Sequence, residues 1–533
     1  MKRLGIVMLV GTLALLAIPG IGHAEDEGDL ADRWLAGKRT AWALQGGKQP
    51  GSISAVECTA TGNPAANVNL DCDDPFPNNE PDIEVDPADP LHMIASSNDY
   101  GTCCDEFYTT FDGGKTWVTG NMSNEGPTVI GSDPVTVFDV KHGTAIHTSL
   151  NFKANANYAC HGDLVASVST DGGVKWQSPS VVYNGRGCDN APTQYFADKE
   201  WIVVDNNPSS PYYGTAYLTW TVFVSHKLNY ASSPIFEATS TDGGFTWSTP
   251  KVISGTNRAL CTLQEDGIDN GACDESTFSV PTVGPNGTVY VAFQNWQNEA
   301  LNEPRELYDD QYLVVRSADR GRTWSKPRFV VGLEDGTRDY PINVDERQTL
   351  SGYQVRVNSA GNIVADPNNG TLSLVFSDNR AGTHDVNHPV TNTNVYLMRS
   401  TNGGTSWSGP TVVNGSTTDQ WFPWVDVNPV NGEVGIVYND RLASNPALYN
   451  ATFSRWNGGG FSTSVVSTAP SHPNRAVAFQ ADVPSCELCS TFHGDYIGLS
   501  YGTDGTANLA WTDMRDFDQE EGAYLQFIYF ARR

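Results

Sequence analysis

Hydrophobic and polar residues alternate along most of this chain in short runs separated by turn residues. The segments "VYVAFQN" (289–295) and "QYLVVRS" (311–317) are typical. Successive side chains of a β-strand point to opposite faces of a sheet, so a period of two indicates strands with one more deeply buried face. After the first two dozen residues no sustained period of 3.6 residues appears. The pattern therefore predicts an all-β protein built from many short strands.

One eight-residue turn motif recurs between these strands. Its third residue is Asp or Asn, which accepts hydrogen bonds from backbone N–H groups of a turn, and its fifth is Gly, which adopts backbone conformations that other residues avoid. Its last residue, Trp, is a large apolar plate suited to packing between sheets. Because a strand precedes and follows each copy, we interpret the motif as a hairpin turn. The five copies are TFDGGKTW (110–117), STDGGVKW (169–176), STDGGFTW (240–247), SADRGRTW (317–324) and STNGGTSW (400–407).

The spacing of these turns predicts the architecture. Their third residues are 59 to 83 positions apart, and another pair of short alternating runs precedes each turn. A repeat of this length with four strands per unit is typical of a β-propeller. Seven such pairs occur, the sixth followed by a degraded turn, "SRWNGGGFS". The seventh unit ends in a third strand, "AYLQFIYFARR", with nothing after it. We therefore predict seven blades, with six as the alternative, and expect a strand from before Asn78 to complete the last blade.

The turns match the pattern S-x-D-x-G-x-T-W, so residues 78–533 resemble the sialidase-like (BNR or Asp-box repeat) β-propeller superfamily. The resemblance implies that the turns lie on the face opposite the active site. It also implies an activity on sugars. Asp boxes are nevertheless found in sialidases, other glycoside hydrolases, some polysaccharide lyases and non-enzymatic propellers. The motif thus indicates the fold more narrowly than the function, and we interpret the turns as scaffold.

The N-terminus reads as an export signal. Lys2 and Arg3 precede an apolar run over 4–18, and Gly22-His23-Ala24 supplies small residues for cleavage. The run is shorter than the roughly 20 apolar residues needed to span a membrane. We predict a signal peptide over 1–24, an N-terminal extension over 25–77 and a secreted or periplasmic propeller with no membrane span.

Ten cysteines suit an oxidising compartment. Sequence neighbours are candidates for local disulfides, and the adjacent Cys103 and Cys104 are left over. The candidate pairs are Cys58 with Cys72, Cys160 with Cys188, Cys261 with Cys273, and Cys486 with Cys489.

Charge excludes one class of partner. The chain has 32 basic and 61 acidic residues, a net charge of −29, which repels nucleic-acid phosphates.

The predicted chemistry requires no cofactor and no catalytic metal. The acidic segment 263–276 offers oxygen ligands for a structural calcium ion. His384 and His388 have i, i+4 spacing, but neighbouring Pro and Asn favour a loop there over a metal-binding helix. The sequence carries no signal for an oligomeric state.

Three arginines follow the second strand of consecutive units, in "SDNR", "YNDR" and "WTDMR". Arg380, Arg441 and Arg515 are therefore expected on one side of the channel rim. A guanidinium group grips a carboxylate at two points, and the resemblance to sialidases, which use an arginine triad on this face, implies a clamp for a substrate carboxylate. In the alternative, each arginine pairs with its neighbouring aspartate and braces the loop; these aspartates are Asp378, Asp440 and Asp513.

A second set of candidates precedes the first strand of each unit. Paired carboxylates at one rim suit acid–base catalysis on a glycosidic bond, because crowding of like charges raises one pKa. Tryptophans there would stack on sugar rings. In the alternative, the carboxylates that precede a proline cap turns. The aligned positions hold the carboxylates Glu80, Asp133 and Asp495, the pair Lys199 and Glu200, and the tryptophans Trp421 and Trp424.

The resemblance to sialidases also implies a tyrosine nucleophile assisted by a glutamate, for which Tyr353, with Glu346 seven residues earlier, is the candidate. Two features depart from sialidases. These enzymes have six blades, and they carry an Arg-Ile-Pro segment where this chain reads "NNEPDIEVD".

The function predicted from these features is an exported carbohydrate-active enzyme, a glycoside hydrolase acting on acidic sugars in the manner of an exo-sialidase. Its partner would be a carbohydrate or glycoconjugate substrate. A first alternative is a lyase on uronate polymers, with Tyr353 or His493 removing a proton. A second is a non-catalytic propeller that binds a protein or glycan on the same face.

Overall fold

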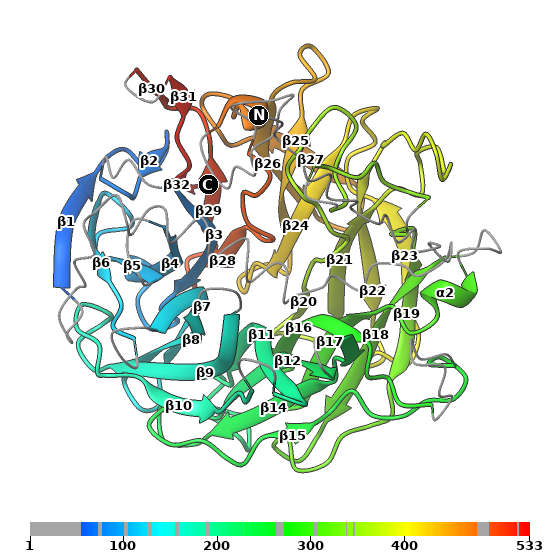
Figure 1. Cartoon of the computed structure of the whole chain (residues 1–533). Helices are drawn as coiled ribbons and strands as arrows, with labels where there is room; N and C mark the ends of the chain where they lie inside the picture. The colour runs from blue at the N-terminus through cyan, green and yellow to red at the C-terminus, as the bar shows by residue number, and fades with distance from the viewer. Residues whose placement is uncertain are drawn as a thin grey trace, which may run out of the picture.

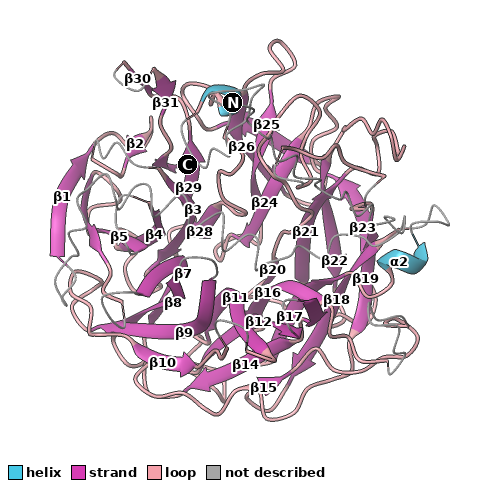
Figure 2. Cartoon of the chain, viewed as in Figure 1, coloured by secondary structure: helices cyan, strands magenta, loops and turns pink. Residues whose placement is uncertain are grey.

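Seven antiparallel sheets surround a central channel in this computed structural model of the chain (Figure 1). The prediction of an all-β propeller with seven four-stranded blades is confirmed. Helical structure among the described residues is confined to α2 (Glu299–Asn302) and a 3-10 turn at Pro473–Arg475 (Figure 2). The structure describes residues 55–72, 77–100, 105–124, 129–154, 159–187, 191–226, 229–262, 271–302, 308–336, 338–344, 347–476, 490–519 and 522–533.

Each blade begins with its innermost strand. Blade one contains β3 (Asn78–Val85), β4 (Met93–Asp99), β5 (Asp105–Thr110) and β6 (Thr116–Asn121), with β1 (Ala55–Thr61) added outside. Blade two contains β7 (Val129–Asp139), β8 (Thr144–Ala154), β9 (Ala159–Ser169) and β10 (Ser180–Tyr183). Blade three contains β11 (Gln194–Val204), β12 (Ala216–His226), β14 (Ile235–Ser240) and β15 (Lys251–Val252), and β13 (Asn229–Ser232) also pairs with β12.

The remaining blades follow the same order. Blade four contains β16 (Ser276–Val283), β17 (Val289–Asn295), β18 (Asp310–Ser317) and β19 (Arg328–Leu333). Blade five contains β20 (Ile363–Ala365), β21 (Leu372–Asp378), β22 (Asn394–Ser400) and β23 (Ser408–Val412). Blade six contains β24 (Gln420–Val427), β25 (Val434–Arg441), β26 (Tyr449–Trp456) and β27 (Phe461–Val465). Blade seven contains β28 (Gly498–Tyr501), β29 (Ala507–Asp513), β32 (Phe527–Arg532) and β2 (Val68–Asn69), and β30 (Phe517–Asp518) pairs with β31 (Ala523–Tyr524).

The two ends of the described chain share blade seven. Its outermost strand is β2, which pairs with β32 so that Val68 lies opposite Phe530. The Asp71 carboxylate also accepts a hydrogen bond of 2.6 Å from the Ile528 N–H group. The ring is thus closed by hydrogen bonds between segments more than 450 residues apart.

The five motif turns join the third and fourth strands of their blades, and in each the Asp or Asn side chain accepts backbone N–H groups of the turn. In the first, Asp112 Oδ1 accepts the N–H groups of Lys115 and Thr116 at 2.9 and 3.0 Å. Gly114 N–H donates to the Thr110 hydroxyl, and the Trp117 indole donates to the Gly114 carbonyl, both at 3.1 Å. Trp117 is fully buried, its ring 5.0 Å from that of Phe530 in blade seven. The turn therefore anchors a ring that packs one blade against the next.

Replacing Gly114 by alanine is expected to lower the free energy of unfolding by about 2 kcal/mol or more. Gly114 has a φ of +85°, and a Cβ atom there would lie 2.2 Å from the Phe530 ring. The control is Gly459→Ala in the degraded turn of blade six, where the nearest atom is 3.6 Å away. Chemical denaturation of both variants measures the difference, and equal losses would contradict this interpretation.

The motif turns and the candidate site residues lie on opposite faces. Neighbouring strands are antiparallel in every blade, so the end of a third strand and the end of a second strand are at opposite edges of the sheet. We call the face that carries the ends of the second strands the upper face. It holds Arg380, Arg441 and Arg515, together with the segments that precede the innermost strands.

Polar side chains in or next to the innermost strands join neighbouring blades at three places around the channel. Asp82 Oδ2 accepts the Thr136 N–H group at 2.9 Å, and Asp426 Oδ2 accepts the Tyr501 N–H group at 2.7 Å. Asn362 Oδ1 accepts the N–H group of the next blade in the same way, at 2.7 Å. Burial raises the pKa of both Asp82 and Asp426 to about 7. These acids therefore serve as structural acceptors inside the channel.

Two predicted disulfides are confirmed, Cys58–Cys72 and Cys261–Cys273. Each of the other predicted cysteine groups includes a residue outside the described ranges. The predicted signal peptide, Glu346 and residues 263–270 of the predicted calcium loop also lie outside them. Within the described ranges, no helix has the length and apolar character needed to cross a bilayer.

Candidate functional site at the channel mouth

The innermost strands of five blades carry a β-bulge close to the upper face. At each bulge a residue other than glycine has a positive φ, which costs about 1–3 kcal/mol and persists only where its surroundings hold it. In blade seven, Gly494 has a φ of +91° immediately before Asp495. At the start of six blades, the backbone of these segments thus changes the direction in which the neighbouring side chains point. The positive-φ residues are Glu80, Asp133, Lys199, Phe278 and Phe422.

Charged residues from these segments form a buried group that we call the central charge cluster, consisting of Glu80, Asp133, Lys199, Arg356 and Asp495. Lys199 Nζ lies 2.5 Å from Asp495 Oδ2 and 3.7 Å from Asp133 Oδ2. Arg356 binds the same Asp495 carboxylate with two nitrogens, one at 3.1 Å. Residues from five blades therefore meet at the channel mouth, including the three carboxylates expected from the sequence.

Glu80 and Asp133 are linked directly and through Asn98. The two carboxyl groups share a side-chain hydrogen bond. Asn98 donates to Glu80 Oε2 at 2.5 Å and accepts the Asp133 N–H group at 2.9 Å. Asp495 N–H donates to Glu80 Oε1 at 3.0 Å. Glu80 therefore sits between the two aspartates.

The cluster displaces these pKa values in opposite directions. Burial, reinforced by the charge of Asp133, raises the pKa of Glu80 well above its ordinary value. Burial opposes ionisation of Asp133 as well, but Lys199 and the hydrogen bonds of the site hold the pKa of Asp133 below its ordinary value. Arg356 and Lys199 likewise hold the pKa of Asp495 low against the effect of burial. The arrangement thus favours a proton on Glu80 over one on either aspartate, the division that acid–base catalysis uses.

A cavity that opens to solvent adjoins the cluster, with about 390 Å³ of space not filled by atoms when the open solvent is included. The Trp201 ring lies 4.3 Å from that of Trp424 and 5.3 Å from that of Tyr496, so aromatic rings narrow it. The buried Tyr496 hydroxyl has no hydrogen-bond partner among the described residues. The cavity thus offers apolar plates beside charged groups, a combination suited to sugars. Its lining comprises Lys199, Glu200, Trp201, Phe278, Ser279, Val280, Ala360, Gly361, Pro423, Trp424, Asp495 and Tyr496.

The three arginines differ from the predicted clamp, because each is engaged by an aspartate. Arg380 Nε and Nη2 donate to Asp378 at 2.8 and 2.6 Å, and Arg515 Nε donates to Asp513 at 2.9 Å. Arg441 Nη1 donates at 2.6 Å to Asp419 rather than to its neighbour Asp440. In all three cases, N–H donors of the guanidinium group are already occupied by an aspartate of the protein. The geometry favours the bracing alternative.

Trp421, expected to stack on sugar, is fully buried. Its indole N–H donates to His493 Nε2 at 3.3 Å, and its ring lies 5.1 Å from that of Tyr449. Trp421 is therefore part of the packing under the upper face and offers no open ring surface. Trp424 differs, since it lines the cavity.

Tyr353 and His493 also lie away from the cavity lining. Tyr353 is 1% exposed, and the Arg441 guanidinium lies 4.1 Å from its ring. Burial raises the pKa of Tyr353 far above its ordinary value, so it is a neutral phenol at neutral pH rather than an activated nucleophile. His493 is 2% exposed, and burial lowers its pKa to about 3, which keeps the ring neutral. Neither side chain lines the cavity, and neither belongs to the central charge cluster.

Two site residues were not predicted, Arg356 and Trp201. Arg356 lies seven residues before the innermost strand of blade five, whereas Asp495 lies three residues before that of blade seven. Trp201 follows Lys199 and Glu200 directly in "DKEWIVVD". Extending the alignment by one residue in blade three would have found Trp201, but the longer segment before blade five hides Arg356 from it.

No known family model matches this chain, and no curated protein matches its sequence. Similar solved structures include an ulvan lyase of polysaccharide lyase family 25, at 10% identity and a TM-score of 0.45, covering 90% of this chain and 95% of that one. A Penicillium chrysogenum α-L-arabinanase complexed with arabinobiose has 12% identity and a TM-score of 0.42, covering 76% and 99%. The Hadza microbial sialidase Hz136 has 13% identity and a TM-score of 0.39, covering 83% and 73%. At these identities the likeness shows the fold alone.

Proposed function

We propose that this chain is an exported carbohydrate-active propeller, a glycoside hydrolase whose substrate site is the upper mouth of the central channel. The observation that carries the proposal is the meeting of Glu80, Asp133 and Asp495 from three blades, with pKa values displaced in opposite directions. Glycoside hydrolysis needs one protonated carboxyl group and one carboxylate at the scissile bond. Export is supported by the two disulfides, which form and persist in oxidising compartments.

The proposed roles follow from the contacts. Glu80 is the general acid, and a glycosidic oxygen would replace Asp133 as the acceptor of its proton. Asp133 then stays ionised and stabilises positive charge on the sugar. Lys199 lines the cavity, and the carboxylate of an acidic sugar would compete with Asp495 and Asp133 for its ammonium group. Asp495 holds Lys199 in place.

The second candidate is a non-catalytic propeller that binds a glycan at the same mouth. Two observations favour it. The Trp201–Trp424 contact narrows the cavity. Glu80 and Asp133 are 1% and 6% exposed and bonded to each other, which leaves no open space between them. Binding without turnover would then depend on the aromatic rings rather than on the proton of Glu80.

Replacing Glu80 by glutamine is expected to reduce turnover by roughly 10²- to 10⁴-fold, the usual contribution of a general acid. Activity is measured on sialosides, uronic-acid polymers and neutral glycosides. Glu84→Gln, a change on the same strand outside the cluster, is the matched control and keeps wild-type activity. If the wild-type chain turns over none of these substrates but binds a glycan, and Glu80→Gln binds it equally well, the second candidate replaces the first.

A further inference from the structure

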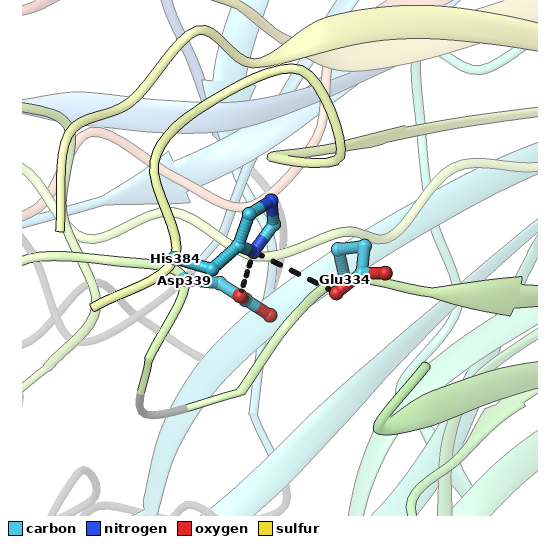
Figure 3. A group of neighbouring side chains, drawn as sticks. All are labelled: Glu334, Asp339 and His384. Carbon is cyan, nitrogen blue, oxygen red and sulfur yellow. Dashed lines mark hydrogen bonds and ion pairs between the residues drawn. The ribbon is translucent and has the colours of Figure 1, made fainter. Parts of the chain in front are cut away.

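Three side chains with metal-binding atoms meet on the upper face between blades four and five (Figure 3). Glu334 follows β19 directly, Asp339 lies in the loop after it, and His384 belongs to the loop that leaves β21. Their ligand atoms all lie within 4.8 Å of one another. His384 Nδ1 contacts Asp339 Oδ1 and lies 3.7 Å from Glu334 Oε2. Two blades thus contribute one nitrogen and two oxygen ligands to one point.

Neighbouring hydrogen bonds hold these ligands in position. Asp339 Oδ2 accepts the Gly336 N–H group at 2.9 Å, which leaves Oδ1 directed at His384. The Glu334 N–H group donates to Asp378 Oδ2 at 3.0 Å. His384 is about one-third exposed, so its Nε2 side remains accessible to water. Support of this kind is what orients the ligands of a metal site.

The surroundings are strongly acidic. Asp310 and Asp335 are each 6% exposed, and Gln294 Nε2 bridges one oxygen of each at 2.9 Å. Their other oxygens, Asp310 Oδ1 and Asp335 Oδ1, have no hydrogen-bond partner among the described residues. Asp335 is the direct neighbour of Glu334, so one of these acceptor oxygens without a donor belongs to the loop that carries two of the three ligands.

We propose that Glu334, Asp339 and His384 bind a divalent transition-metal ion such as Zn²⁺. One imidazole nitrogen and two carboxylate oxygens suit Zn²⁺, which takes His, Asp and Glu ligands at about 2.0–2.2 Å. Ca²⁺ suits the group poorly, because it takes about 6–8 oxygen ligands. The ion would bridge the loop after β19 in blade four and the loop after β21 in blade five. It lies outside the central charge cluster and is independent of the function proposed there.

A comparison within the chain sharpens the inference. His142 Nδ1 lies 2.7 Å from Asp139, and His92 Nδ1 lies 3.0 Å from Asp86. Within the described ranges, neither of these histidine–aspartate pairs belongs to a group of three such ligands. His384 differs from them by the presence of Glu334. Glu334 therefore distinguishes the His384–Asp339 pair, as a candidate metal site, from the other two histidine–aspartate pairs.

The test uses the full-length mature protein without an affinity tag, freed of metal with EDTA and dialysed. Titration with Zn²⁺ by calorimetry is expected to show one ion per chain, and Zn²⁺ is expected to raise the melting temperature of the wild-type protein more than that of Glu334→Gln. His384→Gln and Glu334→Gln should each weaken Zn²⁺ binding at least roughly 10-fold, while the control His142→Gln retains wild-type affinity. Circular dichroism in EDTA checks that each variant is folded.

Equal Zn²⁺ affinity in wild type and Glu334→Gln would overturn the proposal, as would equal shifts of the two melting temperatures on adding Zn²⁺. Glu334 is partly exposed, so its variant carries the test even if His384→Gln fails to fold. Retained binding in both variants would assign the ion to another group of histidines.

Discussion

Replacing Asp495 by asparagine is expected to lower the free energy of unfolding by about 3–5 kcal/mol, the cost of removing one partner from a buried ion pair. Asp495 is 2% exposed and is the carboxylate that Lys199 and Arg356 share. Without its charge, Lys199 keeps Asp133 at 3.7 Å as its anionic neighbour, and two buried cations face a neutral amide. Denaturation with urea, followed by circular dichroism, measures the loss.

Two further variants test whether the loss in Asp495→Asn is specific to a buried ion pair. Asp504→Asn weakens a partly exposed pair with Arg532, and it should cost less than about 1 kcal/mol. The double variant Lys199→Met/Asp495→Asn should cost less than the sum of its single changes, because removing both partners leaves less unpaired charge. Similar losses for Asp495→Asn and Asp504→Asn would show that the central charge cluster contributes nothing beyond a surface contact.

The melting temperature is expected to be higher at pH 5 than at pH 8. Burial raises the pKa of Asp71, Asp82 and Asp426 to about 7 and that of Asp335 to about 8. The folded chain therefore holds protons that the unfolded chain has released above about pH 4. The stability that these protons contribute is complete below about pH 4 and is lost as the pH rises through 7 to 8.

Other groups have the opposite effect and make the folded state less stable as the pH falls. The folded state keeps His493 neutral, with a pKa of about 3, so its contribution is present above about pH 6.5 and is lost on acidification. Asp133 and Asp495 have lowered pKa values, and their contribution is lost only as the pH falls below about 4. Burial also lowers the pKa of His472, so two histidines compete with several carboxyl groups between pH 5 and pH 8, and the carboxyl groups dominate.

Melting curves in EDTA from pH 5 to pH 8 measure the balance. Asp82→Asn and Asp426→Asn keep a side-chain oxygen as acceptor but lose the titration, so each should flatten the pH dependence. Asp319→Asn is the control, since hydrogen bonds from Thr323 lower the pKa of Asp319 to about 2, outside the tested range. A melting temperature that rises from pH 5 to pH 8 in the wild-type chain would contradict the assignment.

The sequence predicts the propeller well because its signal is local and repeated. Each motif turn needs Asp or Asn to accept N–H groups, Gly for a positive φ and Trp for packing, and these demands are visible in eight residues. Aligning the segments before the first strands also selects Glu80, Asp133 and Asp495, which meet although hundreds of residues separate the first from the last. Strand order alone brings such positions to the channel mouth.

A local stretch of sequence does not show which residue a side chain will pair with, or whether that side chain will be buried. Arg441 has Asp440 beside it in sequence, yet it pairs with Asp419, because that carboxylate lies across the loop. Trp421 reads like an exposed sugar-binding residue but is covered by Tyr353, Tyr449 and His493. The bulges at Glu80 and Asp133 use no glycine, so nothing in the local sequence indicates their positive φ. These features depend on contacts between distant segments.

The pairing of β2 with β32 fixes when the molecule can become complete during synthesis. A ribosome that has made the first six blades has also made β2, but the strand that β2 needs is still to be translated. During synthesis β2 therefore waits without its partner strand until β32 has been translated. Termination before Phe527 would remove the strand that joins β2 to β29, so the seventh blade could not form.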